Sequence, residues 1–218
     1  MDLGSLYEFA LRTKPPGAGK VVFGIGRQNP RFPYRVRIVL TRRGTAVACP
    51  EESTLARAQR VLTPDLLRRM GRSARAAQRA LREFGVRDVL VDGRFSTREG
   101  EFRPCCDHDV LRLKPSAADG PALGEAYVVM DGEEIACRGL LLASSDCPGA
   151  CEIANIRTEP RFRRRGMARS VASEIASDIL KRGAVPVFTC SLSNTASLAI
   201  RRSLGFRRFA TEITGMGP

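Results

Sequence analysis

The feature that most constrains this chain is a strand, a basic glycine turn and a helix that follow one another directly. The apolar run at residues 153–158 predicts a buried strand, and Glu159-Pro160 interrupts it. An arginine-rich turn spans residues 161–168. A helix with apolar side chains at helical spacing comes next and closes at Gly183. Free N–H groups at such a turn, together with the helix dipole, favour an anion. The pattern therefore predicts an anion-binding cradle.

The turn also carries a recognisable motif. Residues 163–168 read Arg-Arg-Arg-Gly-Met-Ala and resemble the Arg/Gln-x-x-Gly-x-Gly/Ala signature of the GNAT superfamily of N-acetyltransferases. Three further marks stand at that family's distances: Thr158-Glu159-Pro160, Asn194-x-x-Ser197 and Leu204-Gly205-Phe206. The resemblance covers about residues 125–213. It implies an α/β (α+β) fold, with a mixed, splayed β-sheet flanked by helices.

The resemblance implies acetyl-CoA as co-substrate, and it places the pantetheine arm between strands 153–158 and 185–190. Gly166 would let the backbone approach the pyrophosphate closely. An ordinary turn glycine is the alternative. The expected cofactor-binding residues lie on the first strand, the turn and the later helix: Ile156, Thr158, Arg163, Arg164, Arg165, Gly166, Met167, Ala168, Asn194, Ser197 and Arg201. Asn194 is equally suited to a plain helix cap.

The reaction that the resemblance implies is direct transfer of an acetyl group to a primary amine. Glu152 stands where the histone acetyltransferases of this superfamily carry their base glutamate; an exposed strand-end carboxylate is the alternative. Many members have a tyrosine acid seven residues after the asparagine, but this chain has Arg201 there, so that role cannot be carried over. Cys190 and Ser191 fall near the thioester end. Direct transfer argues against an acyl-carrying Cys190.

Composition narrows the class of protein. The 218 residues carry a formal net charge of +13, which attracts anionic cofactors or nucleic acid. The chain lacks zinc-finger spacings and is only 6% aromatic, which makes a nucleic-acid function the weaker interpretation. The seven cysteines, the absence of a leader-like N-terminus and the absence of a long apolar span indicate a cytoplasmic protein that does not enter membranes.

The only histidine lies in Cys105-Cys106-Asp107-His108-Asp109 and suggests a metal site at first sight. Ligands at adjacent positions cannot easily converge on one tetrahedral ion, and no second cluster at zinc spacing exists. We therefore expect no metal.

The domain prediction is an N-terminal accessory α+β region over residues 1–118 and a GNAT-like acetyltransferase domain over 119–218. In the N-terminal region the sequence predicts a helix over 2–12, a strand over 21–26, a hairpin over 34–49, a helix to Leu62, one continuous helix from Thr63 to Gly85 and a strand over 86–91 that ends at Asp92-Gly93. A linker or loop is predicted over 114–124. In the C-terminal region, outside the cradle, it predicts a hairpin over 125–143, a last strand over 207–213 and a loose tail from Thr214.

The sequence thus predicts an acetyl-CoA-dependent N-acetyltransferase whose N-terminal region shapes the acceptor site. Two other classes stay open: a non-catalytic acyl-CoA-binding regulatory module, and a basic nucleic-acid or ribosome-associated protein. The acceptor, whether a small amine, an antibiotic, a peptide terminus or a lysine, cannot be identified from the sequence. Neither can the oligomeric state.

Overall fold

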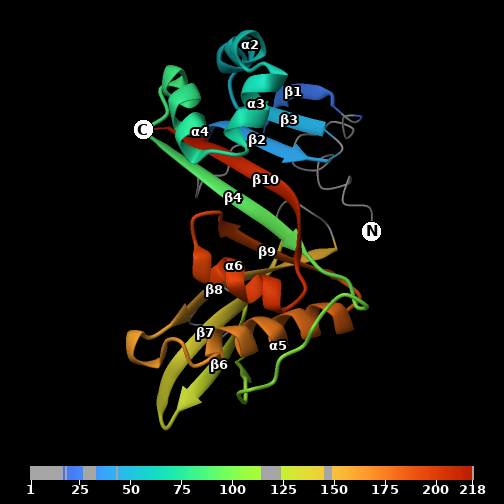
Figure 1. Cartoon of the computed structure of the whole chain (residues 1–218), viewed down its shortest axis with the longest axis vertical. Helices are drawn as coiled ribbons and strands as arrows, with labels where there is room; N and C mark the ends of the chain where they lie inside the picture. Colours follow the sequence, from blue (N-terminus) through green and yellow to red (C-terminus); the bar gives the residue numbers. More distant parts are fainter. Residues whose placement is uncertain are drawn as a thin grey trace. The chain divides into compact units, whose positions relative to one another are not determined.

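The computed structural model describes residues 17, 19–26, 33–42, 44–113, 124–144 and 149–217. Two compact units form: Met1–Arg94 with Arg208–Pro218, and Phe95–Arg207 (Figure 1). The predicted helix over 2–12, nearly all of the predicted linker over 114–124 and the predicted domain boundary at 118/119 lie outside the described residues. Fold class is confirmed as mixed α/β, with a mixed sheet flanked by helices.

The sheet of the first unit has the strand order β1-β3-β2-β10-β4. Its strands are β1 (Val21–Ile25), β2 (Tyr34–Thr41), β3 (Gly44–Cys49), β4 (Asp88–Ser96) and β10 (Arg207–Met216). The predicted hairpin of β2 and β3 is confirmed. The predicted loose tail is wrong up to Met216, because β10 continues in antiparallel pairing with β2. The predicted strand end at Asp92-Gly93 is also wrong, since β4 continues through it.

The helices of this unit are α2 (Glu52–Val61), α3 (Pro64–Met70) and α4 (Ala74–Leu81), followed by a 3-10 turn. Thr63 caps α3 as predicted, with its hydroxyl accepting from the N–H of Leu66 at 3.3 Å. The single helix predicted from Thr63 to Gly85 is wrong. It breaks at Gly71, and Ser73 caps a new helix by accepting from the N–H of Ala76 at 3.2 Å.

The sheet of the second unit has the order β9-β8-β7-β6-β5. Its strands are β5 (Leu111–Leu113), β6 (Glu125–Asp131), β7 (Glu134–Ala143), β8 (Ala150–Thr158) and β9 (Val185–Ser191). The predicted β6–β7 hairpin is confirmed. β8 and β9 run parallel and are paired only over Ala150–Ile153 with Val185–Phe188, as far as the described residues show. Because β8 continues to Thr158, the two strands splay apart as predicted.

Two helices of this unit, α5 (Met167–Lys181) and α6 (Thr195–Ser203), follow the two splayed strands. α5 packs on β7 at Gly139, where a Cβ atom would lie 2.7 Å from Val171 Cγ1 and 3.0 Å from Ile175 Cδ1. Opposite Gly139, β8 has a bulge at Asn155 and Ile156, because the register shifts there and Asn155 has φ 51°. The bulge falls where β8 leaves β9.

An ionic cluster fastens the far end of α5 to β6. Arg182 donates to both carboxylate oxygens of Glu125, at 3.0 and 2.7 Å, and Arg112 lies 2.6 Å from the same group. The Tyr127 hydroxyl donates to Asp178 at 2.5 Å. The hydrogen bonds from Arg182 lower the pKa of Glu125 to about 2, against a smaller opposing effect of burial, and Arg112 adds to the lowering.

Glu125→Gln is expected to reduce the free energy of unfolding by about 1–2 kcal/mol at pH 7, the usual value of hydrogen bonds to a charged group. Folding lowers the pKa of Glu125. The wild type is therefore more stable than the variant above about pH 4.5, and this difference in unfolding free energy is lost as the pH falls toward about 2. Urea denaturation of both proteins between pH 7 and pH 2.5 measures this. An equal difference at all pH values would contradict the assignment.

Candidate active site at the start of the long helix

The turn and helix start that the sequence predicts as a cradle lie at the N-terminus of α5. The loop before the helix has two residues in the left-handed region, Arg164 with φ 65° and Gly166 with φ 85°. Arg169 is the first residue of α5 whose N–H bonds back, to Gly166 O at 2.9 Å. Among the described residues, no acceptor meets the five consecutive N–H groups from Arg164 to Ala168. Such a row of free donors at a helix start suits an anionic group such as a diphosphate.

The side chains of the loop make different contacts. Arg163 Nε donates to Thr158 O at 3.2 Å and so ties the loop to the end of β8. Arg165 lies over the ring of buried Phe162, at 5.5 Å from its centroid. Arg164 is exposed. Met167 is buried in the core, so its backbone is the part that faces a ligand.

The splayed part of β8 holds the two predicted strand residues. Ile156 packs against the core that α5 covers. The Thr158 hydroxyl donates to Cys137 Sγ at 3.2 Å, which turns this side chain toward β7. The backbones of both residues thus lie along the gap opened by the splay. Their contact with a pantetheine arm stays a prediction.

The predicted residues of α6 have structural roles in the absence of a ligand. Asn194 Oδ1 accepts from the N–H of Ser197 at 3.1 Å and caps the helix. The Arg201 guanidinium carbon lies 3.8 Å from the centroid of the Phe95 ring, and Nη1 donates to Phe206 O at 3.4 Å. The aromatic ring and the carbonyl thus hold Arg201. A cofactor role for these three residues stays a prediction.

Glu152 lies on β8 within its paired part, opposite Leu142 on β7 and Val187 on β9. Its neighbour Ile153 belongs to the core under α5, so strand alternation places Glu152 on the opposite face. The side chain is half-buried. At the end of β9, Cys190 is buried, and the Ser191 hydroxyl lies 2.8 Å from that of Ser193.

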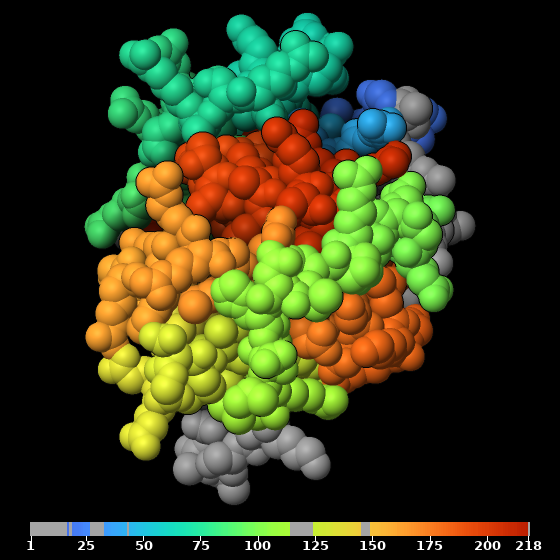
Figure 2. Space-filling model, turned by 60° about the horizontal axis from the view of Figure 1, so that its bottom comes forward, coloured from blue at the N-terminus to red at the C-terminus, as the bar shows by residue number. Residues whose placement is uncertain are grey.

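Sequence reasoning missed the segment between β4 and β5, which runs over α5 beside the cradle (Figure 2). The N–H of Cys105 donates to the Ser173 hydroxyl at 2.8 Å, and Arg169 is ion-paired with Asp107. A Cβ on Gly166 would lie 3.7 Å from Asp107 Oδ2. The available signal was Ser170 and Ser173, two serines on an otherwise apolar helix face, both almost fully buried.

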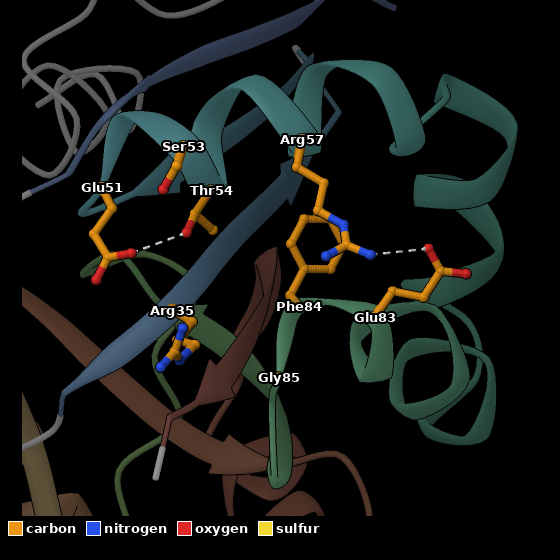
Figure 3. A pocket seen from close by; sticks show the side chains of 8 residues that line it. All are labelled: Arg35, Glu51, Ser53, Thr54, Arg57, Glu83, Phe84 and Gly85. Atoms are coloured by element: carbon orange, nitrogen blue, oxygen red, sulfur yellow. Dashed lines mark hydrogen bonds and ion pairs between the residues drawn. The ribbon is translucent and has the colours of Figure 1, made fainter.

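The first unit has a separate pocket, with a volume of about 450 Å³ (Figure 3). Two pairs of side chains in its wall contact each other: Arg57 lies 3.9 Å from Glu83 and over the Phe84 ring, and Thr54 donates to Glu51 at 3.3 Å. This pocket thus has side chains of both charges in its wall.

The described residues contain no group of three His, Cys, Asp or Glu side chains that could hold a metal ion. In the same part of the chain, no helix is both long enough and apolar enough to cross a membrane.

A family model matches residues that lie mostly in the second unit. Residues 115–212 match the family model described as GNAT acetyltransferase. A structure described as a GNAT-family acetyltransferase from Novosphingobium aromaticivorans is 21% identical, with a TM-score of 0.52 over 61% of this chain and 67% of that one. A GNAT-family acetyltransferase from Colwellia psychrerythraea is 10% identical, with a TM-score of 0.49 over 65% of this chain and 61% of its own.

This chain thus spans about two thirds of the length of those proteins. The comparison with curated proteins gives no match. The family match at residues 115–212 confirms the resemblance predicted over about 125–213. By its motif, its splayed sheet and this match, the part of the chain over residues 115–212 is similar to the GNAT acetyltransferases.

Proposed function

We propose that this protein is a cytoplasmic N-acetyltransferase that transfers an acetyl group from acetyl-CoA directly to a primary amine. The observation that carries the proposal is the row of five free N–H groups from Arg164 to Ala168, next to the gap between β8 and β9. These donors suit the diphosphate of coenzyme A, and the splayed strands suit its extended arm. The match of residues 115–212 to the GNAT acetyltransferase family model supports acyl transfer.

Acetyl-CoA supplies an activated acetyl thioester, and the protein has to supply a neutral amine in position. An ammonium group cannot attack until it loses a proton, so a carboxylate that accepts this proton, directly or through water, accelerates the reaction. Glu152 is our candidate, because it lies on β8 just before the strand leaves β9. By holding the diphosphate, the cradle would restrict where the thioester lies relative to Glu152, which lowers the entropic cost of the encounter.

A screen of amines with acetyl-CoA tests the function. Thiol release would be followed for polyamines, amino acids, aminoglycosides, peptide N-termini and lysine peptides, and mass spectrometry would identify each product. A mass increase of one acetyl group on an amine, dependent on the protein, is the expected result. Coenzyme A binding without turnover of any amine would favour a regulatory module. Salt-dependent nucleic-acid binding without coenzyme A binding would reject the proposal.

Cys190→Ala and Ser191→Ala are each expected to keep at least about a tenth of wild-type activity. The thiol of the leaving group has an ordinary pKa of about 8.5, so water can protonate the thiolate near neutral pH. A dedicated acid would contribute roughly 10²-fold. Steady-state kinetics on both variants measure this. A hundredfold fall in kcat for Cys190→Ala, with intact coenzyme A binding, would show that this thiol is the acid or the nucleophile.

A further inference from the structure

The anion cradle has a carboxylate of the protein at its entrance. Asp107 belongs to the segment between β4 and β5, and its Oδ2 lies within van der Waals reach of a Cβ on Gly166, at 3.7 Å. His108 Cε1 lies 4.0 Å from the same point. A negative charge at this place is favourable, because the surrounding loop is rich in arginine and its free N–H groups favour anions. The carboxylate therefore occupies a place that also suits an anionic ligand.

Hydrogen bonds and packing hold the segment against the rest of the unit, so the position of the Asp107 carboxylate does not depend on its ion pair alone. The N–H of Arg103 donates to Leu204 O at 3.1 Å, and the N–H of Cys105 donates to the Ser173 hydroxyl at 2.8 Å. Cys105 Sγ lies 3.8 Å from the Ser170 hydroxyl, and Phe102 packs against the core. Figures 1 and 2 both show the segment beside α5. These anchors place Asp107 at the first turn of α5.

Arg169 forms an ion pair with Asp107, and its guanidinium group has further N–H donors for a second acceptor. Its Nη2 donates to Asp107, whereas its Nε is buried and has no acceptor among the described residues. The Arg169 side chain is 41% exposed, so Asp107 and its segment do not enclose it fully.

We propose that Asp107 is an affinity-determining residue that competes with the phosphate groups of coenzyme A for the cradle and for Arg169. This inference rests on the proposed function and deepens it. While the site is empty, the carboxylate neutralises Arg169. When a diphosphate enters, it takes over Arg169 at the cost of repulsion from Asp107. Acetyl-CoA and the product coenzyme A carry the same phosphates, so Asp107 weakens both and speeds product release.

Asp107→Asn is expected to tighten coenzyme A binding by about fivefold or more, because the carboxylate beside Gly166 no longer repels the phosphates and no longer occupies Arg169. The side chain is 50% exposed, so the variant should fold, and Asp107→Ala provides a second neutral version. Asp109→Asn is the matched control: it makes the same charge change two residues along the exposed segment. Calorimetry with coenzyme A, and kinetics with acetyl-CoA and with S-acetylpantetheine, are the measurements.

The supporting result is tighter coenzyme A binding and a lower KM for acetyl-CoA in both Asp107 variants. Their KM for S-acetylpantetheine should equal the wild-type value, and Asp109→Asn should bind coenzyme A as the wild type does. S-acetylpantetheine lacks the diphosphate and so isolates the phosphate effect. Weaker or unchanged binding in the Asp107 variants, or an equal gain in Asp109→Asn, would overturn the inference while leaving the proposed function intact. A wild-type protein that binds no coenzyme A would instead reject the proposed function itself.

Discussion

Gly166→Glu is expected to weaken acetyl-CoA binding by at least about tenfold, or roughly 1.4 kcal/mol. The glycine has φ 85°, next to the free N–H groups that would hold the diphosphate. A glutamate there adds bulk and a negative charge at the cradle. It also adds a second carboxylate beside Asp107, whose Oδ2 lies 3.7 Å from the new Cβ. Calorimetry with acetyl-CoA measures the loss.

Gly183→Glu is the matched control for this experiment. Gly183 follows the C-terminal end of the same helix, has φ 69°, and a Cβ there would meet nothing within 4 Å. The control therefore carries the same charge change and a comparable backbone cost of about 1–2 kcal/mol, without touching the cradle. Both variants should lose similar thermal stability, and only Gly166→Glu should lose affinity. Equal affinity in the two variants would reject the cradle assignment.

The cradle could be predicted from sequence because its determinants are local. A left-handed glycine, the arginines and the start of a helix follow one another within a few residues, so spacing alone defines the geometry. The cap at Asn194 is equally local. The resemblance to the family signature then supplied the expected ligand, which periodicity by itself does not identify.

Asp107 could not be predicted because its position depends on long-range packing. It lies 59 positions before Gly166 in the sequence, and buried hydrogen bonds to Ser170 and Ser173 bring its segment to α5. The same segment, read alone, suggested a metal cluster. The pairing of β10 with β2, and hence its place in the first unit, is equally non-local.

The two helices found where one was predicted, from Thr63 to Gly85, show a different limit of prediction from sequence. The arginine-rich stretch after Thr63 has continuous helical periodicity, which favoured one helix. Packing decided otherwise: a Cβ on Gly71 would lie 3.3 Å from Leu40 Cδ2, so the helix ends against β2. The Ser73 hydroxyl then caps the next helix. A glycine followed by a serine two positions later is a weak signal beside a strong apolar repeat.

Glu152→Gln is expected to lower the acetylation rate by roughly 10²-fold at neutral pH, the usual contribution of a positioned base. The amide keeps the size of the side chain and its place between β7 and β9, so coenzyme A binding should not change. The loss should shrink as the pH rises, because the amine then deprotonates without help. Rates between pH 6.5 and pH 9.5, measured with the best amine of the screen, test this expectation.

The pH profile separates a base from a structural carboxylate. A glutamine that only disturbs the packing of β8 would reduce the rate by the same factor at every pH and would lower thermal stability as well. Glu133→Gln makes the same charge change in the exposed turn of the β6–β7 hairpin and should leave the profile untouched. If the Glu152→Gln loss is constant with pH, the proton must leave the amine by another route, and Glu152 would be a structural residue of the strand.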